Sequence, residues 1–171
     1  MSKYHAKYVH WNSVTRTVLD SNLANRLRSG KQRRLPEYVK RFDSQHEFRV
    51  YLELIRIYGE NRVKKQTLIN ILPPGLCYPK GKGWKVDFAI TDPVFDHRHH
   101  CFIEAKGVVT REFIYTLACL EAYKPQVFNN LYLVFPHRIP TNNRTINGLK
   151  KTYWNEQLLT LKDLKKWKET I

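Results

Sequence analysis

Apolar residues recur with a helical period directly after Asp43 and Ser44. Their spacings of three and four place them on one face of a helix. Gly59 follows the last of them, and glycine commonly ends helices. The pattern predicts an amphipathic helix whose buried stripe consists of Phe48, Tyr51, Leu52, Ile55 and Tyr58.

Shorter patterns predict strands and two further helices. Alternating or continuous apolar residues indicate strands over 67–72, 84–90, 101–106 and 131–135. Thr110 is placed to cap a helix, and Thr160 with Asp163 three residues later indicates a last one. The face expected to be shared on the first of these helices consists of Phe113, Ile114, Leu117 and Glu121.

The order of these elements is helix, three strands, helix, strand, helix. This order is typical of an α/β fold with a mixed sheet. The first forty residues show little periodicity, apart from a short helix indicated over 18–27 and a basic loop over 29–34.

Length and composition set limits on the class of protein. The chain has 171 residues, of which 42% are hydrophobic and 13% aromatic, so it can fold around its own core and is not a disordered chain. No apolar run approaches eighteen residues, so we expect no transmembrane helix and no membrane partner. The three cysteines are widely spaced, and the first five residues lack the apolar segment of a secretory signal. We therefore expect a cytoplasmic or nucleoid-associated protein, not a secreted one.

Charge gives the first positive indication of function. Thirty Lys and Arg against fifteen Asp and Glu give a net charge of +15, which favours a nucleic-acid partner. Residues 1–41 carry ten basic residues against two acidic ones, and 137–171 carry eight against three, so the centre is close to neutral. We predict a basic N-terminal DNA-contacting extension over 1–41, a core over 42–136, and a basic C-terminal extension with a helix over 137–171.

Asp87, Glu104 and Lys106 are the candidate chemical groups of the central strands. Side chains alternate along a strand, so Glu104 and Lys106 point to the same face, and a hairpin would bring Asp87 to them. Charged residues within apolar strands are costly unless they are paired or coordinate something. A simple buried ion pair is the alternative interpretation.

The same residues resemble the signature of the PD-(D/E)XK nucleases. Val86-Asp87-Phe88 and Ile103-Glu104-Ala105-Lys106 match its two strands, although Val86 stands where the name-giving proline would be. The resemblance covers roughly residues 42–136. It implies a restriction-endonuclease-like αβββαβ core with a mixed central sheet flanked by helices. Junction-resolving, transposase-subunit and intron-homing endonucleases share this core.

Ser44 and Glu47 have two interpretations. Ser-x-x-Glu is the pattern of a capping box, in which the glutamate accepts a backbone hydrogen bond at the helix start. The same four residues resemble the helical motif of the nuclease superfamily, which implies that Glu47 reaches a second metal or orients a metal-bound water. The spacing alone favours the cap, and the presence of Asp87 and Glu104 favours the metal-site role.

The resemblance implies a Mg²⁺ site with Mn²⁺ as a substitute. Asp87, Glu104 and the Ala105 carbonyl would hold the ion, since Mg²⁺ prefers hard oxygen ligands and takes few protein carboxylates. Lys106 would position or deprotonate the attacking water, or neutralise the phosphate. The candidate DNA-contacting residues, which are equally compatible with solvated turns and helix starts, are Lys31, Arg33, Arg34, Lys80, Lys82, Lys85 and Arg111.

The sequence thus predicts a Mg²⁺-dependent endodeoxyribonuclease that hydrolyses phosphodiester bonds in double-stranded or branched DNA. Homing, junction resolution and transposon-end cleavage remain open as biological roles. We expect a homodimer or higher homo-oligomer, because small nucleases cut both strands most easily with two-fold symmetry. The alternative is a non-catalytic nucleic-acid-binding protein that retains a nuclease-like fold.

Overall fold

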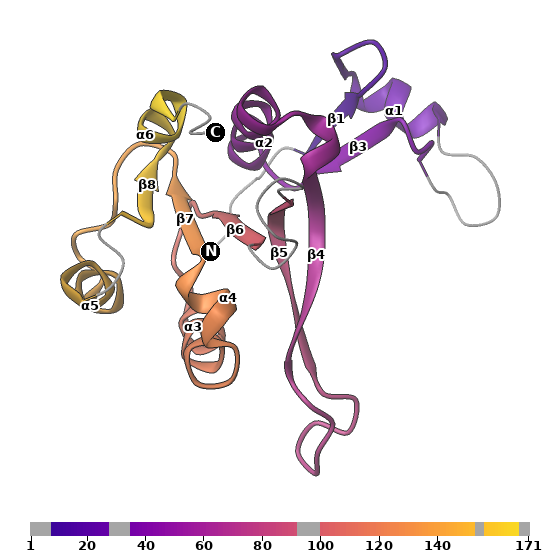
Figure 1. Cartoon of the computed structure of the whole chain (residues 1–171). Helices are drawn as coiled ribbons and strands as arrows, with labels where there is room; N and C mark the ends of the chain where they lie inside the picture. The colour runs from indigo at the N-terminus through magenta and orange to yellow at the C-terminus, as the bar shows by residue number, and fades with distance from the viewer. Residues whose placement is uncertain (1–7, 28–34, 92–99, 153–155, 168–171) are drawn as a thin grey trace, which may run out of the picture. The chain divides into compact units, whose positions relative to one another are not determined.

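The computed structural model describes residues 8–27, 35–91, 100–152 and 156–167. The chain divides into two compact units, Met1–Arg49 and Val50–Ile171, which are considered separately below (Figure 1). The candidate DNA contacts Lys31, Arg33 and Arg34 lie outside the described residues. No helix in the described ranges is both long and apolar enough to cross a membrane.

The first unit contains a three-stranded antiparallel sheet. β1 (Val9–Asn12) lies between β2 (Thr17–Leu19) and β3 (Val39–Phe42), and α1 (Ser21–Leu27) follows β2. The rings of Trp11 and Phe42 lie 6.4 and 5.2 Å from the ring of Phe48 in the first turn of α2. The helix expected over 18–27 is therefore wrong at its start, because Val18 pairs with Trp11 and extends the sheet.

The second unit is built on an open, mixed sheet of five strands. The strands in their spatial order are β4 (Val63–Leu72), β5 (Lys82–Thr91), β6 (His100–Ala105), β7 (Leu131–Phe135) and β8 (Leu158–Thr160). The first three are antiparallel neighbours, whereas β6, β7 and β8 run parallel. The expected α/β class with a mixed sheet is confirmed, and the C-terminal segment adds β8 to it.

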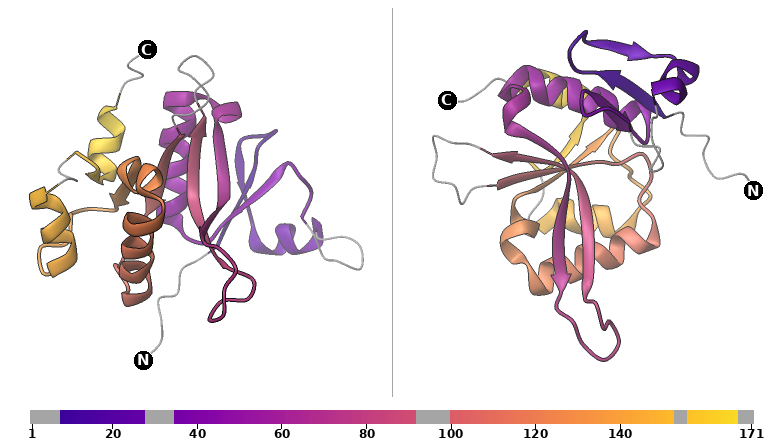
Figure 2. Two further views of the ribbon diagram at one scale, coloured as in Figure 1. Left: turned by 60° about the horizontal axis from the view of Figure 1, so that its bottom comes forward. Right: turned by 90° about the vertical axis from the view of Figure 1, so that its right-hand side faces the viewer.

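Helices cover both faces of this sheet within the second unit (Figure 2). On one face α3 (Arg111–Tyr123), α4 (Pro125–Asn129) and α5 (Arg144–Thr152) pack on the main apolar core. On the other face Tyr51 of α2 (Gln45–Tyr58) stacks on Phe88, and Trp167, after α6 (Leu161–Lys166), meets Tyr132 edge-on. A short 3₁₀ helix, Glu60–Arg62, joins α2 to β4.

The buried faces of two helices differ from those expected. On α2 the buried side chains include Val50, Leu54 and Ile57 beside Tyr51, whereas Leu52 is exposed. On α3 the buried face contains Leu120 and Thr116 with the expected Phe113 and Leu117, and Glu121 is exposed. Each helix carries apolar residues at more than one angle, so only the contacts with the sheet decide which face is buried.

The last helix begins with the cap that its sequence predicts. Thr160 Oγ1 accepts from the Asp163 amide at 3.2 Å, and the Asp163 carboxylate accepts from the Thr160 amide at 2.9 Å. The hydrogen bond from the Thr160 hydroxyl is the main reason why the pKa of Asp163 is lowered.

We expect Asp163→Ala to lower the free energy of unfolding at pH 7 by about 1 kcal/mol, because the capping box loses the acceptor of the Thr160 amide and hydroxyl. Since the pKa of Asp163 is lowered in the folded state, its contribution is present above the unfolded pKa and is lost as the pH falls through the folded pKa. Urea unfolding at pH 7 and pH 3 measures this. A difference between wild type and variant that stays the same at both pH values would contradict a role for the carboxylate charge.

Candidate active site

The strands β5 and β6 separate at the candidate site. They pair from Thr91 with His100 to Phe88 with Ile103, and continuing this register would place Asp87 opposite Glu104. From Asp87 toward the hairpin tip, β5 keeps its pairing with β4. Backbone N–H and C=O groups that lose a strand partner must find another hydrogen-bond partner. The separation therefore creates a place where side chains complete the hydrogen bonding.

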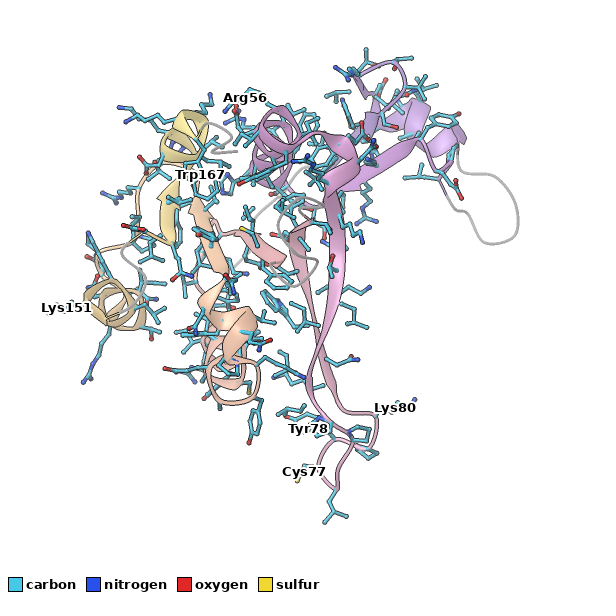
Figure 3. The ribbon with its side chains drawn as sticks, in the orientation of Figure 1. Arg56, Cys77, Tyr78, Lys80, Lys151 and Trp167 are labelled. Atoms are coloured by element: carbon cyan, nitrogen blue, oxygen red, sulfur yellow. The ribbon has the colours of Figure 1, made fainter. Side chains whose placement is uncertain are left out.

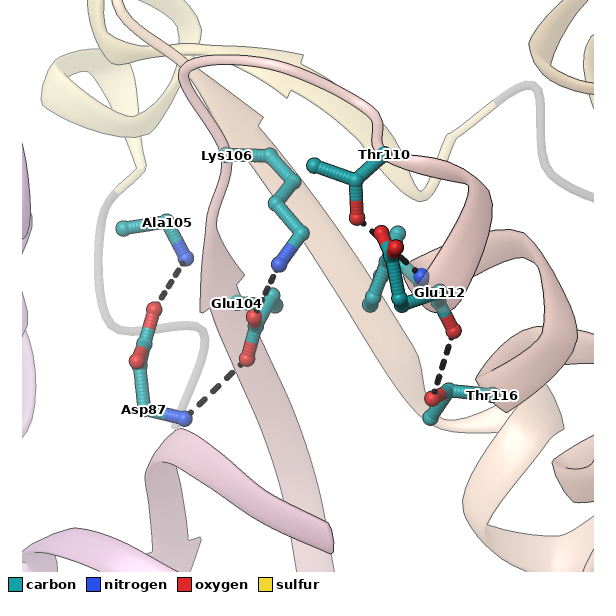
Figure 4. A network of polar contacts seen from close by, with 8 residues as sticks. Asp87, Glu104, Ala105, Lys106, Thr110, Glu112 and Thr116 are labelled. Atoms are coloured by element: carbon teal, nitrogen blue, oxygen red, sulfur yellow. Dashed lines mark hydrogen bonds and ion pairs between the residues drawn. The ribbon is translucent and has the colours of Figure 1, made fainter. Parts of the chain in front are cut away.

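Two carboxylates complete it reciprocally, as Figure 4 shows. The Ala105 amide donates to Asp87 Oδ2 at 2.9 Å, and the Asp87 amide donates to Glu104 Oε2 at 3.2 Å. Each carboxylate thus binds the backbone of the strand opposite to its own. The hairpin geometry expected from the sequence is confirmed, because Asp87 and Glu104 meet across the two strands.

Lys106 joins the same cluster from the end of β6. Its Nζ donates to Glu104 Oε1 at 2.6 Å and lies 3.8 Å from the centroid of the Phe113 ring. The Lys106 amide donates to the Val134 carbonyl at 2.8 Å, which fixes the backbone. The side chain of Glu104 is 6% exposed and that of Lys106 is 19% exposed. A carboxylate so buried needs a positive partner, and Lys106 supplies it in this structure.

The direction of the β5 side chains changes at Asp87. Val86 belongs to the core under α3, and the Trp84 ring lies 6.2 Å from that of Phe113. Phe88 instead stacks on Tyr51 on the opposite face. Regular alternation along this strand would put Trp84, Val86 and Phe88 on one face, and the structure instead divides them between the two faces. On β4, Gln66 lies between the residues paired with Val86 and Phe88 and has a φ of 52°, so the irregularity involves both strands.

Glu47 lies in the first unit and caps α2. Its carboxylate accepts from the Asp43 amide at 2.7 Å, and its own amide donates to Ser44 Oγ at 3.0 Å. The Ser44 half of the capping interpretation is thus confirmed, whereas the Glu47 carboxylate, on a residue only 4% exposed, binds the amide of Asp43 in place of the expected Ser44 amide. Its role toward a metal or a metal-bound water remains a prediction.

The oxygen ligands where β5 and β6 separate fit a hard cation that takes few protein ligands. No group of three or more His, Cys, Asp and Glu side chains that could hold a metal gathers among the described residues. Two carboxylates, Asp87 and Glu104, meet instead, beside the last peptide of β6 at Ala105. This is the number of protein carboxylates that Mg²⁺ commonly takes, because it keeps several of its waters. The set is unlike a structural zinc site, which takes four Cys or His ligands.

The predicted DNA-contacting residues that the structure describes lie in the second unit. Lys80, Lys85 and Arg111 are exposed, and Lys82 is partly buried at the start of β5. Phe113 was expected only on the shared face of its helix, and its contact with Lys106 was missed, although its position soon after the Glu104–Lys106 segment was a usable signal.

A hollow at the ends of two parallel strands was also missed. It has a volume of about 350 Å³ and is lined by Gly107, His137, Arg138 and Thr141 among others. It lies beyond the carboxyl ends of β6 and β7, where ligands of open α/β sheets commonly bind. His137 and Arg138 are exposed and line this hollow.

Comparison of the chain with protein-family models, with curated proteins and with solved structures finds no match. The assignment of a function therefore rests on the residues and geometry described above.

Proposed function

We propose that the protein is a Mg²⁺-dependent DNA endonuclease of the PD-(D/E)XK type, with a restriction-endonuclease-like αβββαβ core. The observation that carries this proposal is the meeting of Asp87, Glu104, Ala105 and Lys106 where two antiparallel strands separate. The order of α2, β4, β5, β6, α3 and β7 supports it, as does the parallel pairing of β6 with β7. Mn²⁺ is expected to substitute for Mg²⁺.

In this proposal Asp87, Glu104 and the Ala105 carbonyl hold the metal ion. The bound ion would supply positive charge at the phosphate and lower the pKa of a bound water. The Lys106 ammonium, held against Glu104 and the Phe113 ring, positions the attacking water or neutralises charge on the phosphate. Asp87 keeps Ala105 in place through its amide, so the ligands form one rigid group.

The charge distribution supports DNA as the substrate. The two terminal segments, 1–41 and 137–171, carry most of the net charge of +15, which suits them to backbone phosphates. A homodimer would place two such sites on the two strands of a duplex. Homing, junction resolution and transposon-end cleavage all remain possible uses of this arrangement.

The experiment that tests the proposal is a cleavage assay of the full chain. Supercoiled plasmid, linear duplex and a four-way junction are each incubated with Mg²⁺, with Mn²⁺ and with EDTA. We expect metal-dependent cutting of at least one substrate and none in EDTA. Absence of cutting across these substrates with both metals, in a preparation that binds DNA, would favour the alternative of a non-catalytic binding protein.

That alternative has one observation against it. Glu104 is 5% exposed and Asp87 lies beside it, and a protein that only binds phosphates gains nothing from two carboxylates near them. A binder would be served by lysine or neutral residues at these positions.

The basic segment 29–34 predicts a measurable salt dependence of DNA binding. We expect the triple variant Lys31→Ala, Arg33→Ala, Arg34→Ala to reduce the slope of log K against log salt by up to about 2.7, because each lost phosphate contact removes about 0.9. Fluorescence anisotropy between 50 and 200 mM salt measures it. The site residues are untouched, so single-turnover cleavage of saturated DNA should persist. An unchanged slope would mean that this loop does not contact DNA.

A further inference from the structure

The hairpin between β4 and β5 ends in an exposed apolar tip. All residues from 73 to 80 are exposed, and Leu76 is 103% and Tyr78 49% exposed. Figure 3 shows Cys77, Tyr78 and Lys80 at the far end of the hairpin. The tip sequence is Pro-Pro-Gly-Leu-Cys-Tyr-Pro-Lys, whereas ordinary surface turns are rich in polar residues. Exposed apolar clusters bordered by charge mark interaction sites.

This tip is an ordered structure. Gly75 and Tyr78 exchange two backbone hydrogen bonds of 2.9 and 3.1 Å, which enclose Leu76 and Cys77 in a two-residue turn. The Gly81 amide donates to the Tyr78 carbonyl at 2.8 Å. Gly81 has a φ of 71°, and a Cβ there would lie 2.6 Å from the Leu72 carbonyl oxygen, so only glycine fits. Because the tip is ordered before it meets a partner, little entropy is lost on binding.

The charge of the hairpin identifies the kind of partner. From residue 63 to residue 86 the hairpin carries five lysines and no acidic residue. The lysines are Lys64, Lys65, Lys80, Lys82 and Lys85. An apolar protein partner would not require this uniform positive charge, whereas the phosphates on both sides of a DNA groove would. Proteins that bend DNA combine such cations with an apolar wedge.

We infer that the β4–β5 hairpin is a wedge whose Leu76 and Tyr78 insert into a base step of duplex DNA, while Lys80 and Lys82, the lysines nearest the tip, contact the flanking phosphates. This inference deepens the proposed function, since it takes DNA as the partner. Insertion removes Leu76 from water and requires partial unstacking of one step. Steps that unstack easily, such as TA and CA, would therefore bind best.

The length of the hairpin sets the distance between the wedge and the phosphodiester bond that is cut. Lys82 and Asp87 lie on the same strand, and five residues at about 3.3 Å each separate them by about 17 Å. The tip lies beyond Lys82. With the hairpin lying along the DNA groove, at about 3.4 Å per base pair, the wedged step lies about five base pairs or more from the hydrolysed phosphate. The wedge thus selects a DNA site by its deformability at a fixed distance from the cut.

A hollow at the base of the tip supports the same arrangement. It has a volume of about 490 Å³ and is lined by Leu72, Pro74, Lys80, Tyr123 and Lys124 among others. Two lysines, one from the hairpin and one from the end of α3, border it. Backbone phosphates beside a widened step would find two cations there.

The test uses the Asp87→Asn variant in EDTA, so that DNA is bound and not cut. Duplexes carry 2-aminopurine at successive positions, and its fluorescence rises where a base unstacks. We expect a rise at one position, at least five base pairs from the site that the wild type cuts in Mg²⁺. Adding Leu76→Ser with Tyr78→Ser should abolish the rise and weaken binding about tenfold. Tyr115→Ser on α3 and Leu52→Ser on α2, both exposed apolar side chains of the second unit, are the matched controls and should change neither.

Thiol labelling gives an independent measurement on the folded wild type. Cys77 is exposed at the tip, whereas burial raises the pKa of Cys101 to about 12 and keeps it a protonated, slowly reacting thiol. DNA should protect Cys77 from a maleimide, while the labelling rate of Cys119 on α3 stays unchanged.

The outcomes separate this inference from the proposed function. Metal-dependent cutting without a fluorescence rise would overturn the wedge and leave the nuclease intact. The same holds if the tip variant binds DNA and raises the fluorescence as the control variants do. Loss of the rise only in the tip variants, together with protection of Cys77, supports the wedge even if no cutting is found. A protein that does not bind duplex DNA overturns the wedge, and cleavage of the four-way junction then decides the proposed function separately.

Discussion

Replacing Asp87 by asparagine is expected to reduce DNA cleavage by at least about a hundredfold while leaving DNA binding equal or tighter. The amide oxygen of asparagine can still accept the Ala105 N–H, so the cluster keeps its backbone geometry. What is lost is one negative charge at the proposed metal site. Removing that charge near DNA phosphates also lowers repulsion, which explains why binding should not weaken.

The measurement is single-turnover cleavage with Mg²⁺, beside anisotropy binding in EDTA. Glu121→Gln is a matched control, because it removes one negative charge from an exposed position of α3 in the same unit. A normal cleavage rate for Asp87→Asn would exclude this cluster as the active site. Equal losses in both variants would instead point to a general effect of charge.

Replacing Lys106 by methionine is expected to lower the free energy of unfolding by about 2 kcal/mol. The change leaves Glu104, whose side chain is 6% exposed, without its ammonium partner at 2.6 Å. Removing one member of a buried pair destabilises by about 3 to 5 kcal/mol, and the partial exposure of Lys106 reduces this. For a chain of this size the melting temperature should fall by about 4 to 8 °C.

The same variant separates a metal site from a plain ion pair. If Asp87 and Glu104 hold a divalent cation, Mg²⁺ should raise the melting temperature of Lys106→Met more than that of the wild type, because the cation replaces the missing positive charge. The double variant Glu104→Gln, Lys106→Met is the control, since it retains the shape and removes the buried charge. If Mg²⁺ changes the melting temperature of all three proteins equally, Asp87 and Glu104 hold no cation, and Glu104 and Lys106 form only an ion pair.

Much of the second unit could be predicted from local patterns. The strands at 84–90 and 131–135, the caps at Thr110 and Thr160, and the end of α2 before Gly59 are all confirmed. These features depend on neighbouring residues, through side-chain alternation, capping hydrogen bonds and the freedom of glycine. The meeting of Asp87 with Glu104 also followed, because antiparallel strands bring such positions together.

Elements of low periodicity could not be predicted. The strands β1, β2 and β3 are three or four residues long, and such short segments carry no detectable pattern. The buried faces of α2 and α3 were missed for another reason: both helices have apolar residues on several sides. The sheet they pack against selected Leu54 and Leu120 and left Leu52 exposed.

By itself, then, the sequence determined the α/β class, the excess of positive charge and the candidate groups Asp87, Glu104 and Lys106. Only the tertiary structure decided that β5 and β6 separate at Asp87, that Lys106 lies on Phe113, and that Leu76 stands exposed at an ordered tip. The physical reason is the range of the interactions. Periodicity and caps act over a few residues, whereas strand separation and burial depend on contacts between segments far apart in the chain.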